Sequence, residues 1–344
     1  MSGTADATTF TPPAPARNFK PRDFVANNPW LKVAAPIATP ILIWLLLPIF
    51  AIDQQAVITR TTPFILTALA VALPARAGLI NVGGEGQLLM GAAASGAFAT
   101  IVGGGLPLIV MLPLMLVAGM IGGLLWAGIA AVLKNGFQVN ETISTLLLNY
   151  VSALFLAYLI HGALKDKASY GFAIGKEIPD SAKLPIIGSG TVHIGIFIAI
   201  AVTAAVWVLI ERSRWGFKAQ VVGGNPEAAR RGGIPVNRTV MVALLLGGAI
   251  AGLAGAIEIS GIEFKLQTGM ATGFGYIGFL CSWMVAHKAA WVPAGATLLA
   301  SIAVYGDNLQ IDHGLPASSV YILMAGIVLA VLAYRGAAKK GGAA

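Results

Sequence analysis

The feature that most constrains this fold is a series of apolar runs along nearly the whole chain. A helix needs about 20 mostly apolar residues to cross the hydrocarbon core of a bilayer. Ten runs approach or exceed this length, and we expect a membrane-spanning helix in each. They are 32–52, 57–77, 87–103, 106–133, 142–164, 192–211, 239–261, 271–287, 289–305 and 318–335. The expected fold class is an all-α polytopic membrane protein.

Composition points to the same class. Only 10% of the 344 residues are charged and 57% are hydrophobic, whereas a soluble domain carries about 25% charged residues. The 42 glycines fit a bundle in which small residues let helices approach closely. Cys281 is the only cysteine, so no disulfide framework exists. The net charge of +8 fits cations collected in cytoplasmic loops, and we expect no nucleic-acid partner.

The distribution of cations predicts the orientation. With ten spans and a cytoplasmic N-terminus, 16 of the 22 Lys and Arg residues fall on the cytoplasmic side. Both termini are then cytoplasmic, with a disordered tail at 1–30, a transmembrane domain at 31–336 and a short tail at 337–344. The segment 212–238 is cytoplasmic and the loop 165–191 is outside. Five spans on each side of this loop would run in opposite senses, which is the arrangement of an inverted repeat.

A glycine-rich stretch joins the second and third apolar runs. It reads RAGLINVGGEGQLLMGA, and its glycines interrupt regular helix. Asn81, Glu85 and Gln87 supply polar groups within it. One interpretation is a tight cytoplasmic turn with solvated polar side chains. The other is a broken helix that lines a transport pathway, because irregular backbone at membrane depth requires protein or a wet cavity around it.

The apolar run at 142–164 begins with a polar segment. Asn140 can cap the helix, and Glu141 follows in its first turn. Polar residues then recur every three or four positions and form one stripe along the helix. They are Thr142, Thr145, Asn149 and Ser152. This stripe is interpreted either as a helix–helix contact or as the lining of a polar pathway.

The remaining ionisable residues give no sign of catalysis. Four carboxylates lie near predicted outer ends of spans, where solvation is the default interpretation; they are Glu258, Glu263, Asp307 and Asp312. The four histidines have no metal-ligand spacing, so we expect no metal site and no cofactor. The chain has neither a G-x-x-x-x-G-K-[ST] phosphate loop nor a G-x-S-x-G nucleophile motif. We therefore expect no enzymatic activity on this chain.

Residues 223–238, GGNPEAARRGGIPVNR, predict a short helix with its own caps. Asn225 suits the N-cap and Pro226 the first helical position. Glu227 complements the positive end of the helix dipole, and Arg230 and Arg231 complement the negative end. The glycines at 232 and 233 can supply a left-handed stop. Because a helix this short is marginally stable in water, we expect a partner to hold it. The alternative is an ordinary basic interfacial loop.

Three stretches resemble the permease subunits of bacterial ABC importers, in the branched-chain-type family that includes ribose and nucleoside permeases. They are GLINVGGEGQLLMGA, VNETISTLLLNYVS and VGGNPEAARRGGI, and the resemblance extends from about Leu31 to Arg335. The Asn-Glu-Thr-Ile segment and the later Leu-Asn-Tyr are closer to the nucleoside branch. The region GFGYIGFLCSWMVAHKAAWVP departs from the family pattern, which has a small-residue and Leu-rich run followed by Asn-Pro. Trp283, Met284, His287 and Trp291 stand there instead.

The resemblance implies that the segment Asn225–Ile234 is the coupling helix that docks in a cleft of the ATPase subunit. Ala228 and Ala229 would give it a smooth face, and Arg230 and Arg231 would reach carboxylates of the ATPase. The implied partners are ABC ATPase subunits, a second permease, an extracytoplasmic binding protein and membrane lipid. The implied location is the bacterial inner membrane, which the chain crosses many times.

The expected function is therefore import of nucleosides or related compounds by alternating access, driven by a separate ATPase. We expect six polar residues near the substrate pathway, namely Asn81, Glu85, Gln87, Asn140, Glu141 and Asn149. Import of simple sugars such as ribose is an alternative. A second is an ion-coupled secondary transporter with Glu141 or Glu258 as the coupling carboxylate. A membrane-bound enzyme is disfavoured, because no catalytic constellation occurs.

Overall fold

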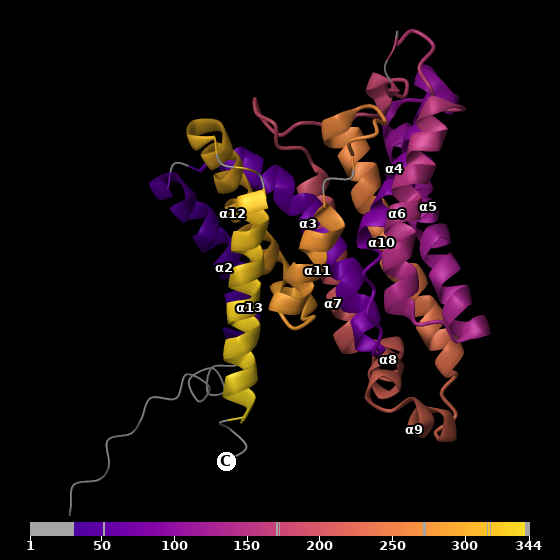
Figure 1. The fold of residues 1–344 in the computed structure, drawn as a ribbon, viewed down its shortest axis with the longest axis vertical. Coiled ribbons are helices and arrows are strands. Elements are labelled where there is room, and N and C mark those ends of the chain that lie inside the picture. The colour runs from indigo at the N-terminus through magenta and orange to yellow at the C-terminus, as the bar shows by residue number, and fades with distance from the viewer. Residues whose placement is uncertain are drawn as a thin grey trace, which may run out of the picture. The chain divides into compact units, whose positions relative to one another are not determined.

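α-Helices make up almost all of the regular structure in this protein, which we describe from a computed structural model (Figure 1). The structure describes residues 31–340 except residues 51, 170, 172, 271, 272, 315 and 317. The tail expected at 1–30 lies outside the described residues, as do residues 341–344. Contacts divide the chain into the units Met1–Ala35 and Pro36–Ala344. The packing described below is that of the second unit.

The described residues form twelve α-helices and, apart from isolated bridges, no β-strand. The helices are α2 Leu31–Leu46, α3 Gln54–Arg76, α4 Gly84–Val102, α5 Leu108–Phe137, α6 Glu141–His161, α7 Gly195–Arg212, α8 Arg214–Gly224, α9 Pro226–Arg231, α10 Val236–Glu258, α11 Phe274–Met284, α12 Val292–His313 and α13 Ser318–Lys340. The prediction of an all-α protein is confirmed.

Among the described residues, seven helical segments are long and apolar enough to cross a membrane; they contain α3, α4, α5, α6, α7, α10 and α12. The other three expected runs hold shorter apolar helices, at Ala34–Ile49, Phe274–Met284 and Ser318–Ala333. The expected count of ten spans is therefore not confirmed. α11 is short because its backbone leaves the helical region on both sides. Gly273 before it has φ +80°, and Ala286 and His287 after it have φ +56° and +57°.

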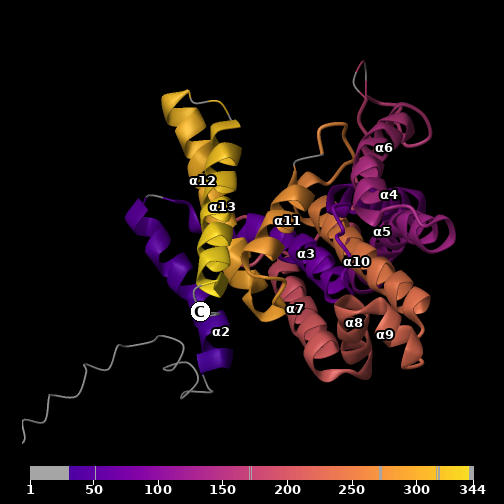
Figure 2. The same cartoon turned by 60° about the horizontal axis from the view of Figure 1, so that its bottom comes forward.

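α3 and α10 form the buried centre of the bundle. They contact each other, while α3 also touches α7, α11 and α12, and α10 also touches α4 and α5 (Figures 1 and 2). Glycines bring α4, α5 and α10 close together, since a side chain at Gly91 or Gly123 would overlap the backbone of Gly252. Small residues at helix contacts are the usual means of packing inside a membrane.

α5, α6 and α7 carry a large part of the outward-facing apolar surface. Ile109 on α5, Leu154 on α6 and Phe197 on α7 are 80%, 73% and 62% exposed. Large apolar side chains in such numbers are unfavourable in water and favourable in lipid. These helices suit a hydrocarbon environment, as the apolar runs predicted.

The connection between α6 and α7 is the long loop that was expected outside the membrane. It contains the 3₁₀-helix η3, Asp180–Ala182, and an isolated bridge pairs Ile186 with His193. The loop folds back over the end of α10, where the π-helix η4, Ile259–Glu263, continues that helix. Leu184 N–H donates to the Ser260 carbonyl oxygen at 2.7 Å. The loop is thereby tied to the end of a central helix.

Candidate functional site

The glycine-rich stretch leaves the helical conformation between α3 and α4. α4 begins at Gly84, three residues earlier than expected, so Glu85 and Gln87 lie in its first turns. The residues Asn81, Glu85 and Gln87 are 0%, 3% and 1% exposed. The interpretation as a turn with solvated polar residues is therefore wrong. The stretch is a buried break between two helices, and its polar groups face protein.

Asn81 and Gln87 satisfy each other across this break. Two amide–amide hydrogen bonds of 3.1 Å join them. Asn81 also donates to the Ala70 carbonyl oxygen of α3 at 3.2 Å and accepts from Gly83 N–H at 3.0 Å. Because all of these groups are buried, an unpaired one would be costly. Asn81 and Gln87 hold the shape of the break.

The polar stripe on α6 packs against the same break. Thr145 Oγ1 accepts from Val82 N–H at 3.2 Å. Asn149 Oδ1 accepts from Gly86 N–H at 2.8 Å, and its Nδ2 donates to the Val82 carbonyl oxygen at 2.9 Å. Asn149 Nδ2 also donates to the Tyr276 hydroxyl at 3.3 Å. The stripe is thus a contact between helices, and through Asn149 it also reaches the cavity described next.

Glu85 joins α4 to the start of α11. Its carboxylate accepts from Gly273 N–H at 2.9 Å and from Gly275 N–H at 2.6 Å. It therefore lies in the first turn of its own helix and against the first turn of α11. A carboxylate is favourable at both places, because the orphan N–H groups of helix N-termini carry positive partial charge.

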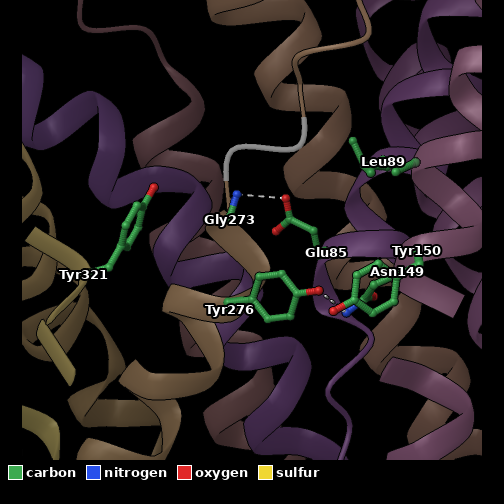
Figure 3. Close-up of a pocket in the computed structure, with 8 residues that line it drawn as sticks. Glu85, Leu89, Asn149, Tyr150, Gly273, Tyr276 and Tyr321 are labelled. Carbon is green, nitrogen blue, oxygen red and sulfur yellow. Dashed lines mark hydrogen bonds between the residues drawn. The ribbon is translucent and has the colours of Figure 1, made fainter. Parts of the chain in front are cut away.

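A cavity of about 330 Å³ opens beside this carboxylate. Figure 3 shows Glu85 next to the Gly273 nitrogen, with the hydroxyl of Tyr276 directed to Asn149. The lining residues come from α4, α6, α11 and α13 and from Gly273 just before α11; they are Glu85, Leu89, Asn149, Tyr150, Ala153, Gly273, Tyr276 and Tyr321. The cavity therefore combines a carboxylate, an amide and three aromatic rings.

The structure brings only two of the six expected pathway residues to this cavity, Glu85 and Asn149. Asn140 and Glu141 lie at the start of α6, where Asn140 Oδ1 accepts from Thr142 N–H at 2.8 Å, as predicted for a cap. Glu141 makes an ion pair with Lys134 at 2.6 Å and accepts from Ile80 N–H at 3.5 Å. Glu141 therefore supports the break and Asn140 caps α6, and neither residue lines the cavity.

Sequence reasoning missed the three tyrosines. Tyr150 follows Asn149 in the Leu-Asn-Tyr segment, and Tyr276 lies in the region that departs from the family pattern. Tyr321 belongs to α13, far along the chain. No spacing rule relates residues on three separate helices, so the sequence carries no signal that they share one cavity.

A second cavity of about 180 Å³ lies at the start of the break. Gly78, Leu79 and Ile80 border it on one side, and Trp283 and His287 border it on another. The Trp283 and His287 rings meet edge to face with centroids 4.9 Å apart, and His287 Nδ1 lies 2.9 Å from Ser282 Oγ. Two of the unusual residues of the 274–291 region, Trp283 and His287, thus pack beside the break.

The short helix α9 has the caps that the sequence predicted. Asn225 Oδ1 accepts from Glu227 N–H and Ala228 N–H, each at 3.0 Å, and Pro226 occupies the first turn. The left-handed residue after the helix is Gly233, with φ +77°, whereas Gly232 has φ −79°. α8 and α9 lie side by side where α7 ends and α10 begins (Figure 2).

The two alanines of α9 differ in exposure. Ala228 is exposed, as are Arg230 and Arg231, but Ala229 is only 1% exposed and belongs to the buried apolar cluster. The expectation that Ala229 forms part of a docking face is therefore wrong. It anchors α9 to its own chain and leaves Ala228 and the charged residues at the surface.

Glu258 is buried, so the expectation that it is solvated is wrong. The residue is 5% exposed, and its Oε2 has no hydrogen-bond partner among the described residues. Asp307 is half-exposed and forms an ion pair with Arg60 of α3 at 2.5 Å. Within the part of the chain that the structure describes, no group of three His, Cys, Asp or Glu side chains could hold a metal ion.

Several known proteins are similar in sequence to this chain over most of its length. The glucose ABC transporter permease protein TsgB13 of Haloferax volcanii is 35% identical over 79% of this chain and 74% of its own length. The guanosine ABC transporter permease protein NupP of Bacillus subtilis is 36% identical over 80% and 79%. NupQ of the same bacterium, also named a guanosine permease, is 30% identical over 84% and 92%. Residues 55–332 match the family described as branched-chain amino acid transport system / permease component, and this chain belongs to that family.

Proposed function

We propose that this chain is the transmembrane permease subunit of an ATP-driven importer for nucleosides or related compounds. The observation that carries the proposal is the cavity beside Glu85 and Asn149, with its three tyrosines. Aromatic rings offer flat faces for a nucleobase. The few polar groups among apolar walls suit the oriented hydroxyls of a ribose. The names of the Bacillus subtilis relatives, both guanosine permeases, support the same class of solute.

The proposed topology has ten spans with both termini in the cytoplasm, arranged as two inverted halves of five in a bacterial inner membrane. Seven long apolar helices support most of these spans. The remaining three spans would be the shorter apolar helices Ala34–Ile49, Phe274–Met284 and Ser318–Ala333. The shortest of them, α11, fits a broken helix, which is tolerated at membrane depth where protein or a cavity surrounds it. Half-helix N-termini that point at a site near the midplane are typical of transporters. Glu85 and Gly273 form such a meeting of helix starts.

The helix α9 would couple ATP hydrolysis by a partner subunit to transport through this chain. Its exposed residues Glu227, Ala228, Arg230 and Arg231 would dock on a partner ATPase, since the chain lacks a phosphate-binding loop of its own. A groove in that partner would supply the tertiary contacts that so short a helix needs. Two paralogous guanosine permeases in Bacillus subtilis support a second, related permease as a further partner. An extracytoplasmic binding protein would deliver the solute.

Uptake by reconstituted vesicles tests this proposal. The chain is purified by a tag together with its copurifying subunits, and radiolabelled guanosine, ribose and glucose are offered with ATP inside the vesicles. We expect uptake of guanosine that needs ATP and the binding protein. Tyr276→Ala should lower it at least about 10-fold, through loss of ring and hydroxyl contacts. Uptake of ribose or glucose in preference to guanosine would contradict the proposed substrate class.

Import of a sugar is the second candidate, because a glucose permease of Haloferax volcanii is as similar as the nucleoside relatives. The competition between the three labelled solutes separates the two. An ion-coupled transporter is a third, since Glu258 is a buried carboxylate with one oxygen that has no hydrogen-bond partner in the part of the chain that the structure describes. Glu258→Gln and Glu141→Gln would stop such a transporter at every pH, whereas ATP-driven uptake should continue.

A further inference from the structure

We propose that Gly78 and Gly223 form the joint that carries movement of α9 to the substrate cavity. This inference rests on the proposed function, because it requires a partner ATPase to move α9. The two glycines would act as positioning residues. They would let the backbone at the end of α8 touch the backbone at the start of the break between α3 and α4.

The joint is a contact between two backbones with no side chain between them. A Cβ at Gly223 would lie 2.6 Å from the Arg76 carbonyl oxygen and 2.8 Å from Gly78 N. A Cβ at Gly78 would lie 3.0 Å from Gly223 Cα. Gly78 also has φ +77°, which other residues rarely adopt. Backbone is much less compliant than a side chain. Displacement of the backbone at Gly223 therefore displaces the backbone at Gly78.

Arg76, two residues before Gly78, makes further contacts that hold the end of α3 in place. It ends α3, and its Nη2 donates to Gln220 Oε1 of α8 at 3.2 Å. Nη2 also lies 3.3 Å from Glu211 Oε1 near the end of α7. The end of α3 is therefore held to both helices that precede α9.

α8 and α9 are built to move as one piece. Asn225 alone separates them, and its N–H donates to the Val221 carbonyl oxygen of α8 while its side chain caps α9. The burial of Ala229 holds α9 against its own chain, and Ile234 N–H donates back to the Ala229 carbonyl oxygen at 2.9 Å. A push on the exposed face of α9 therefore reaches Gly223 without passing through a flexible linker.

From Gly78 the route to the cavity is short. The chain continues through Val82 of the break to Gly86 in the first turn of α4, and Asn149 binds both of these residues while it lines the cavity. On its other side, the start of the break borders the cavity of about 180 Å³. The segment Gly78–Ile80 therefore has free volume to move into. Movement there would shift Glu85 relative to Gly273 across the substrate cavity.

Gly223→Ala tests the joint, and Gly224→Ala is its matched control. Both glycines end α8, and both changes favour helix. A Cβ at Gly224 meets no atom within 4 Å, whereas the one at Gly223 forces the backbones apart. In vesicles with radiolabelled guanosine, Gly223→Ala should lower guanosine transported per ATP hydrolysed by about 3- to 30-fold, while ATP hydrolysis continues. Gly224→Ala should leave that ratio within about 2-fold.

A merely structural role would lower hydrolysis, transport and yield together and leave their ratio unchanged. If Gly223→Ala matches Gly224→Ala while the wild type transports guanosine, the joint is refuted and the proposed function stands. If the wild type transports nothing, the proposed function fails. The joint is then tested by the rate at which a thiol-reactive reagent labels the cysteine of a Tyr276→Cys variant in the cavity. The one native cysteine, Cys281, is buried and therefore adds little to the labelling. ATP should change that rate in the Gly224→Ala background but not in the Gly223→Ala background.

If Gly223→Ala does not assemble with its partners, two changes that add no volume replace it. Arg76→Gln removes both contacts of the guanidinium, and Gln220→Ala removes one of them. We expect Arg76→Gln to lower the transport ratio by about 2- to 5-fold and Gln220→Ala to lower it less. An unchanged ratio in both variants would overturn the proposal.

Discussion

Replacing Asn149 by alanine should remove hydrogen bonds that hold the break between α3 and α4, and should thereby lower the stability of the protein. Asn149 is 3% exposed, and its side chain makes three hydrogen bonds, two of them to the backbone of Gly86 and Val82. Alanine makes none of them. The Gly86 N–H belongs to the first turn of α4, where no helical carbonyl is available to it. The break would then depend on Thr145, on Glu141 and on the amides of Asn81 and Gln87.

The magnitude follows from the two backbone groups that lose their partner. An unsatisfied buried group costs about 1–3 kcal/mol. Side-chain hydrogen bonds between membrane helices average about 0.6 kcal/mol and reach about 1.7 kcal/mol. The Tyr276 hydroxyl faces a cavity and is left out of the sum. Combining the lower part of the first range with the second gives a loss of stability of about 1–3 kcal/mol. With an unfolding entropy of about 2.1 cal/mol/K per residue, this loss lowers the melting temperature of a chain of 344 residues by about 1.5–4 °C.

Cys281 provides the assay. It is the only cysteine of the chain and is 0% exposed, so a thiol-reactive dye reports its exposure as the purified protein unfolds. Cys281 lies in α11, the helix that also carries Tyr276. Scans of all variants are run at one heating rate, because membrane proteins of this size commonly unfold irreversibly.

Two controls isolate the hydrogen bonds. Ser144→Ala removes a buried hydroxyl whose hydrogen bonds, among the described residues, go to the carbonyl oxygens of Asn140 and Glu141 at the start of α6. This change should alter the melting temperature little. Asn149→Leu restores volume without polar groups and should destabilise nearly as much as Asn149→Ala. If Asn149→Ala melts within about 1 °C of Ser144→Ala, the break is not held as the geometry indicates. If Asn149→Leu restores the wild-type value, the loss was one of packing.

Three further outcomes are expected. Ala228→Asp should abolish copurification of the ATPase with an unchanged melting temperature, whereas Ala229→Asp should lower the melting temperature because it buries a carboxylate; the reverse pattern would contradict the exposures of α9. Asn225→Ala should weaken α9 by about 0.5–2 kcal/mol through loss of its cap, seen as faster amide exchange at Glu227 and Ala228. Burial lowers the pKa of His193 from its usual 6.5, and its Nδ1 accepts a hydrogen bond from Gly195 N–H. The unfolded chain therefore binds the proton more readily, so stability is full above about pH 6.5 and falls as the pH is lowered. His193→Asn should reduce the drop in melting temperature between about pH 7.5 and about pH 5.5, and an equal drop in both proteins would exclude His193 as its cause.

The apolar runs by themselves determined the class of the protein and the approximate place of its helices. A bilayer requires helices of a fixed minimum length, so the sequence alone reveals them. The caps of α9 were equally legible, since Asn225 and Pro226 act on backbone groups within three residues of themselves. Local chemistry of this kind needs no knowledge of the rest of the chain.

Only the tertiary structure decided what the polar residues do. Asn81 and Gln87 turned out to bind each other, Ala229 to be buried, and Glu85 to meet α11 nearly 190 residues later in the chain. The cavity draws on α4, α6, α11 and α13, and its tyrosines have no common pattern in the sequence. Periodicity assigns a residue to one face of its own helix, but the neighbour of that face is set by the packing of the whole bundle.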